Sequence, residues 1–85
     1  MHGYKQPPKR LPGFPNAEPR TPKTLISNGG GLRKRWKDPD GTIYEWDYLH
    51  GSVEKFDKRG KHLGEFNFRT GIKLKGPDPK RKIVP

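Results

Sequence analysis

The chain has 85 residues and a mass of 9.8 kDa, which allows one small domain and excludes a large enzyme that encloses a cofactor. Cysteine is absent, so disulfides, thiolate metal sites and a cysteine nucleophile are excluded. Nineteen Lys and Arg against nine Asp and Glu give a net charge of +10, which favours a polyanionic partner over a merely soluble basic surface. No apolar run is long enough to span a membrane, and no amphipathic helix pattern favours a membrane surface.

Residues 1–31 are predicted to form a linker or a loosely draped arm. Six of the ten prolines lie at or before residue 22, and the segment ends in Ser27-Asn28-Gly29-Gly30-Gly31. Its hydrophobic residues are too scattered for helix or strand periodicity, so local order there would require docking onto something else. We therefore divide the chain into this arm and a folded domain over residues 32–85.

From Leu32 onward, short β-rich runs alternate with turn sequences, a pattern that predicts an antiparallel meander. We expect about five strands and a mainly β fold: Leu32–Lys37, Thr42–Tyr48, Ser52–Phe56, His62–Asn67 and Ile72–Lys75. Asp38-Pro39-Asp40-Gly41 has the composition of a turn between the first two strands. The prolines of Gly76-Pro77-Asp78-Pro79 then predict a stiff, extended tail.

The predicted second strand has two faces because side chains alternate along a strand. Tyr44, Trp46 and Tyr48 share one face, and Ile43, Glu45, Asp47 and Leu49 share the other. We expect the aromatic face to form the core, with base stacking as the alternative use of these rings.

Residues 38–57 carry six acidic side chains and one lysine, an acidic island within a basic chain. A two-residue turn at His50-Gly51 would place Asp47 opposite Glu54, and such proximity should raise the pKa of one carboxyl group. With His50, these residues form an acid/base constellation; the alternative is two solvated charges beside a turn histidine. The spacing disfavours a metal site, so no metal or other cofactor is expected. His2 is isolated, as is His62, which we expect to be a cross-strand partner of Phe56 rather than a catalyst.

Phosphodiester transfer on RNA would use such groups, because the ribose 2′-hydroxyl is an internal nucleophile that needs a base, an acid and nearby cations. A metal-free DNA nuclease fits less well. The alternative from another functional class is a non-catalytic RNA-binding module, in which Arg33, Lys34, Arg35 and the tail hold phosphates and Trp36 stacks on a base.

Several segments in one order carry a family resemblance. They are Asn28-Gly29-Gly30-Gly31 with the basic run through Trp36, Ile43-Tyr44-Glu45-Trp46-Asp47, His50-Gly51, Gly60-Lys61-His62-Leu63-Gly64, Thr70-Gly71 and Leu74-Lys75-Gly76-Pro77-Asp78-Pro79-Lys80-Arg81. From about Thr21 to Arg81 the chain resembles the cytotoxic ribonuclease domain of the rRNA-cleaving E-type colicins. Residues 1–20 do not convincingly match, and Ser52 replaces a further family carboxylate between His50 and Glu54.

The resemblance implies a small, strongly twisted antiparallel sheet and a single cut in small-subunit ribosomal RNA at the decoding A site. Glu54 would be the general base, His50 the general acid, Asp47 its orienter or an alternative acid, and Arg81 the phosphate clamp. We expect the RNA-binding residues to be Arg33, Lys34, Arg35, Trp36, Lys75, Lys80 and Lys82. A general ribonuclease without ribosome specificity is a further alternative.

The same resemblance implies two partners, the ribosome and an acidic cognate immunity protein that a +10 toxin would attract. The proline-rich start favours the C-terminal tip of a contact-dependent growth inhibition toxin or a related polymorphic toxin. Such a protein would be secreted or delivered from the cell surface, would meet a membrane only during import, and would act in the target-cell cytoplasm.

Overall fold

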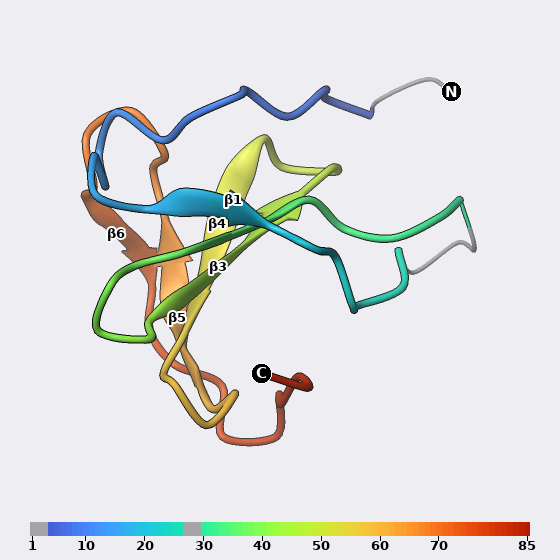
Figure 1. Ribbon diagram of the computed structural model, residues 1–85, viewed down its shortest axis with the longest axis vertical. Helices are drawn as coiled ribbons and strands as arrows, with labels where there is room; N and C mark the ends of the chain where they lie inside the picture. The colour runs from blue at the N-terminus through green and yellow to red at the C-terminus, as the bar shows by residue number, and fades with distance from the viewer. Residues whose placement is uncertain (1–3, 27–29) are drawn as a thin grey trace.

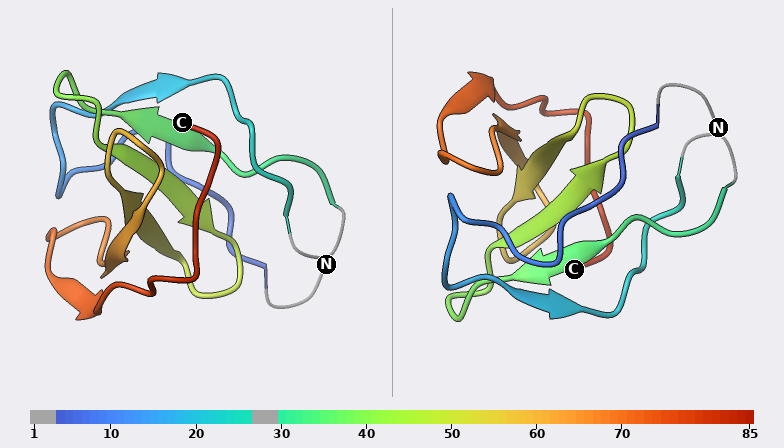
Figure 2. Two further views of the ribbon diagram at one scale, coloured as in Figure 1. Left: turned by 90° about the horizontal axis from the view of Figure 1, so that it is seen from below. Right: turned by 90° about the horizontal axis from the view of Figure 1, so that it is seen from above.

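The computed structural model describes residues 4–26 and 30–85, so His2 and the Ser27-Asn28-Gly29 part of the predicted linker lie outside the described residues. Six antiparallel strands follow one another in chain order across a single open sheet (Figure 1). They are β1 (Glu18–Arg20), β2 (Arg35–Lys37), β3 (Ile43–Asp47), β4 (Ser52–Phe56), β5 (His62–Phe66) and β6 (Lys73–Lys75). The strand directions rotate from one edge of the sheet to the other (Figure 2). The predicted mainly β class and antiparallel meander are confirmed, and the five predicted strands correspond to β2–β6.

The turns form where the sequence predicts them. Between β2 and β3, the Gly41 N–H donates to the Asp38 carbonyl at 3.0 Å, and Gly41 has a positive φ of 95° that its lack of a Cβ permits. The Tyr44 hydroxyl donates to the Asp38 carboxylate at 2.6 Å, which ties this turn to β3. The meander is therefore fixed by local turn chemistry at its first hairpin.

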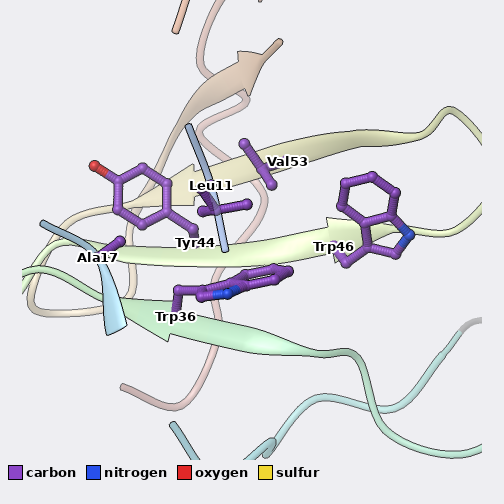
Figure 3. Packing of buried hydrophobic residues seen from close by; sticks show 6 residues of the cluster. All are labelled: Leu11, Ala17, Trp36, Tyr44, Trp46 and Val53. Carbon is purple, nitrogen blue, oxygen red and sulfur yellow. The ribbon is translucent and has the colours of Figure 1, made fainter. Parts of the chain in front are cut away.

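The hydrophobic core lies on the face of the sheet that carries Tyr44 and Trp46 (Figure 3). Its buried residues are Leu11, Ala17, Trp36, Tyr44, Trp46 and Val53, and Phe14, Tyr48, Phe66 and Phe68 pack against them. Trp36 and Trp46 meet edge to face, with ring centroids 6.5 Å apart, an arrangement that aromatic quadrupoles favour. The predicted use of the aromatic face for packing is confirmed.

Residues 4–26 lie against this core. Leu11 and Ala17 are buried in it, and the Trp46 and Trp36 indole N–H groups donate to the Lys5 and Lys9 carbonyls at 2.8 and 3.0 Å. The expectation that the arm contains no strand is wrong, because Glu18–Arg20 pairs with β2 as the edge strand β1. Docking onto the sheet supplies the order that the arm sequence does not encode locally, and the division of the chain at residue 31 stays a prediction.

The opposite face of the sheet is also covered. Ile43 and Glu45, predicted to face away from the core, are buried, because the C-terminal segment runs back over this face (Figure 2). Arg35 Nη2 donates to the Val84 carbonyl at 2.8 Å, and the Ile83 N–H donates to the Gly60 carbonyl at 3.0 Å. The tail after Gly76 has no regular strand, as predicted, but it folds back onto the sheet. None of the described residues forms a helix capable of crossing a membrane.

One row of side chains crosses the covered face from β2 to β6, and Arg20 on the edge strand β1 lies opposite its first member, Arg35. In the pairing registers, Arg35 on β2 lies opposite Glu45, Glu45 opposite Glu54, Glu54 opposite Glu65, and Glu65 opposite Lys75 on β6. All three glutamates are buried. Directly opposed carboxylates destabilise a sheet, so each requires compensating contacts. The partners of these glutamates define the candidate site.

Candidate active site

The loop between β3 and β4 differs from the predicted two-residue turn. The Gly51 N–H donates to the Asp47 carbonyl at 2.8 Å, and the strand register pairs Asp47 with Ser52 and Glu45 with Glu54. The predicted direct opposition of Asp47 and Glu54 is therefore wrong. Asp47 caps the loop itself, because its Oδ1 accepts the backbone N–H groups of Leu49 and His50, both at 2.9 Å.

The same carboxylate also holds the His50 ring. Asp47 Oδ2 lies 2.8 Å from His50 Nδ1, while the His50 side chain is 49% exposed. Burial raises the pKa of Asp47, but the backbone N–H and the ring of His50 lower it more, so the net pKa is below its ordinary value. Asp47 is therefore a carboxylate at neutral pH, and it fixes the orientation of the imidazole.

Glu54 lies at the centre of the site, in the middle strand of the glutamate row. Its Oε1 is 2.7 Å from His62 Nε2 and 3.1 Å from Arg81 Nη1, and its side chain is 5% exposed. The Asp78 backbone N–H donates to His62 Nδ1 at 2.9 Å, which makes Nε2 the ring nitrogen that donates to Glu54. The C-terminal segment thus brings Arg81 to a carboxylate on β4.

His62 is a site residue that the sequence analysis missed. Its predicted pairing with Phe56 is confirmed by the strand register and by ring centroids 5.2 Å apart. However, the expectation that His62 is isolated is wrong, because the ring also bonds to Glu54. A register shift between Lys55 and Phe56 places His62 on this face, and no sequence pattern in the strand reveals such a bulge.

Glu65 is the second missed residue. Its Oε2 accepts a hydrogen bond from Ser52 Oγ at 2.5 Å and lies 3.7 Å from His50 Nδ1. Thus Ser52, which stands where the resemblance implies a carboxylate, instead contacts a carboxylate from the neighbouring strand. Asp47, His50 and Glu65 each place one potential metal ligand atom within 4.8 Å of the others, so these three residues could hold a cation.

Two hollows meet at this cluster. One, of about 360 Å³, has Tyr4, Ile26, Arg33, Tyr48 and Leu49 in its wall, and the other, of about 270 Å³, has His62, Glu65, Lys75, Gly76 and Asp78. Both hollows are also lined by the four predicted catalytic residues Asp47, His50, Glu54 and Arg81. The structure therefore brings these four together at a concave surface with an aromatic side and a charged side, where an extended ligand could lie across them.

The predicted RNA-binding residues are less uniformly placed. Lys75, Lys80 and Lys82 are exposed, and Arg33 and Lys34 are half-buried. Arg35 and Trp36 are 3% and 0% exposed, because Arg35 pairs with Glu45 and Trp36 packs in the core. Their burial prevents Arg35 from holding a phosphate and Trp36 from stacking on a base, so we remove both from the expected RNA-binding set.

The fold and site define the chain as a small all-β domain with a cluster of acidic and histidine side chains in a basic protein. Residues 5–84 match the model of the Cytotoxic family, and the chain belongs to this family. It is 49% identical to colicin E3, 45% to colicin-E6 and 44% to cloacin, all from Escherichia coli, over 96% of its length. The resemblance predicted from the motifs is confirmed, and its expected start near residue 21 is wrong, because the match begins at residue 5. The chain spans only 15–16% of the length of these relatives.

Proposed function

We propose that this chain is the ribonuclease domain of a colicin-like bacterial toxin and that it cleaves small-subunit ribosomal RNA at the decoding A site without a metal ion. The observation that carries the proposal is the cluster of Asp47, His50, Glu54 and Arg81 at the junction of two hollows. Membership of the Cytotoxic family and the likeness to colicin E3 support the toxin class.

In the proposed reaction, the ribose 2′-oxygen attacks the adjacent phosphorus while its proton passes to a Glu54 carboxylate oxygen. The bond from phosphorus to the 5′-oxygen breaks, and that oxygen takes a proton from His50 Nε2. The products are a 2′,3′-cyclic phosphate and a free 5′-hydroxyl. Nδ1 of His50 faces Asp47 at 2.8 Å, which leaves Nε2 as the ring atom directed to the substrate.

Asp47 is assigned as the residue that orients His50 rather than as the acid. Its lowered pKa keeps it without a proton at neutral pH, so it has none to donate. Arg81 is assigned as the phosphate clamp, because its side chain is 40% exposed beside Glu54 and its planar fork can bind two phosphate oxygens. Together these groups would supply charge stabilisation without a bound ion.

We further propose that a larger toxin delivers this domain into the cytoplasm of a target cell, and that an acidic immunity protein neutralises it in the producer. The +10 charge supports both the polyanionic substrate and the acidic partner, since complementary potentials accelerate association.

The test is to treat the protein with EDTA, remove the chelator, incubate the protein with intact ribosomes and map the ends of the small-subunit RNA. We expect a single cut at the A site by the EDTA-treated protein, and a rate that falls by about 10²–10⁴-fold in Glu54→Gln, because the base is lost. Glu18→Gln, an exposed glutamate on β1, is the matched control and should keep the parental rate.

Each alternative predicts a different result. Binding without a fragment would identify a non-catalytic RNA-binding module, and equal cutting of naked RNA would identify a general ribonuclease. Loss of cutting by the EDTA-treated protein, restored by added Zn²⁺, would contradict metal independence and implicate Asp47, His50 and Glu65 as ligands.

A further inference from the structure

Glu65 is the buried glutamate of the row with the weakest neutralisation by cations. Glu45 Oε2 accepts hydrogen bonds from Arg35 Nη2 at 2.7 Å and from Arg35 Nε at 3.2 Å. Glu54 accepts a hydrogen bond from His62 and forms a salt bridge with Arg81. The cation nearest to Glu65 on its own row is Lys75, whose Nζ is 3.8 Å away and whose side chain is 69% exposed. Glu65 therefore lacks a close, buried cation within the row and depends on contacts from outside it.

The remaining contacts of Glu65 all lie toward the candidate active site. Ser52 Oγ donates to its Oε2, and the same oxygen lies 3.7 Å from His50 Nδ1. His50 Nδ1 therefore faces two carboxylates, Asp47 from the end of β3 and Glu65 from β5. Because Ser52 is paired with Asp47 in the strand register, its hydroxyl anchors the second carboxylate beside the first.

We propose that Glu65, anchored by Ser52, is a positioning residue that holds the His50 imidazolium ready to donate its proton from Nε2. The inference rests on the proposed ribonuclease function and adds a residue to it. The Nδ1–H of His50 bonds to Asp47 at 2.8 Å, and the Glu65 carboxylate, 3.7 Å from the same nitrogen, attracts the charged ring from a second side without a hydrogen bond. A ring held from two sides has less freedom to rotate than one held by Asp47 alone. In this role Glu65 acts through His50.

The first experiment is a double-mutant cycle on ribosome cleavage with Glu65→Gln, His50→Ala and the double variant. We expect Glu65→Gln to lower kcat about tenfold with KM within about twofold, less than the loss of the general acid itself. In the His50→Ala background, Glu65→Gln should cause no further loss. An equal loss in both backgrounds would overturn the inference, because it would indicate a structural role.

The second experiment reads the His50 ring directly and needs no RNA cleavage. We expect Glu65→Gln and, to a smaller extent, Ser52→Ala to shift the His50 Nδ1 resonance in ¹⁵N NMR spectra at neutral pH, and Glu18→Gln to leave it unchanged. If Glu65→Gln does not fold, the shift of the His50 Nδ1 resonance in Ser52→Ala is the test. An unmoved resonance would overturn the inference even if the protein cuts ribosomes, whereas a moved resonance without cleavage by the parent would contradict only the proposed function.

Discussion

Asp47 shows how one side chain can couple a loop to the ring of the proposed general acid. One oxygen caps the backbone of Leu49 and His50, and the other contacts the His50 ring. Its pKa lies below the ordinary value of 3.8, so its stabilising contribution is present above about pH 3.8 and is lost as the pH falls through the folded-state value. We expect Asp47→Asn to be less stable than the parent at pH 7, with the difference disappearing in acid.

Urea denaturation of both proteins between pH 2 and pH 7 measures this difference in the free energy of unfolding. A difference that stays constant over the whole range would contradict the assignment.

Sequence patterns and the family resemblance predict which residues gather at the site but not every contact that they make. Asp47, His50, Glu54 and Arg81 come together because the tail folds back over β4, although tail and strand are far apart in sequence. His62 and Glu65 were not predicted as site residues, because their positions depend on a bulge in the β4–β5 pairing and on the register between strands. The alternation of side chains along one strand predicts neither the bulge nor the register.

The strands themselves were largely predictable, since turn residues and β-branched or aromatic runs mark them locally. The register of β3 and β4 was not, because the loop length depends on the Asp47 carboxylate accepting two backbone N–H groups. As a result Glu45, rather than Asp47, lies opposite Glu54. The strand β1 was also unpredictable, because its three exposed residues form it only by pairing with β2.

The buried pair of Arg35 and Glu45 in the glutamate row allows a prediction about the stability of the sheet. Arg35→Met should destabilise the protein by about 3–5 kcal/mol, because it leaves Glu45 charged and buried without its guanidinium. The double variant Arg35→Met/Glu45→Met should recover much of this loss, since no unpaired charge remains. Urea denaturation measures both, and Arg20→Met, at the exposed end of the same row, is the control. A double variant less stable than Arg35→Met would contradict this account.

For the molecule as a whole, packing of the arm can be tested by truncating a single side chain. Leu11 is 1% exposed in the core, so Leu11→Ala should lower the free energy of unfolding by about 2–5 kcal/mol. Leu25→Ala, at a site 70% exposed, should have little effect. Equal, small effects of both substitutions in thermal or urea unfolding would contradict this account. They would show that packing of the arm adds little to the stability of the folded domain, as the predicted division of the chain implies.

The net charge of +10 should make binding of the proposed RNA substrate sensitive to salt. Lys80 and Lys82 are exposed on the C-terminal segment beside Arg81, so Lys80→Gln/Lys82→Gln should raise KM for ribosomes with kcat unchanged. The slope of log affinity against log salt concentration should fall by about one for each lost phosphate contact. Lys58→Gln/Arg59→Gln, on the exposed β4–β5 turn, is the charge-matched control, and equal effects of both pairs would indicate only non-specific attraction.

Both tryptophans of the chain donate their indole N–H groups to carbonyls of the N-terminal arm. Release of the arm would expose both rings to water at once, and their fluorescence would shift to longer wavelength. The domain therefore contains an intrinsic optical reporter of arm attachment, which can be followed in real time on the unlabelled protein during refolding or while a partner binds.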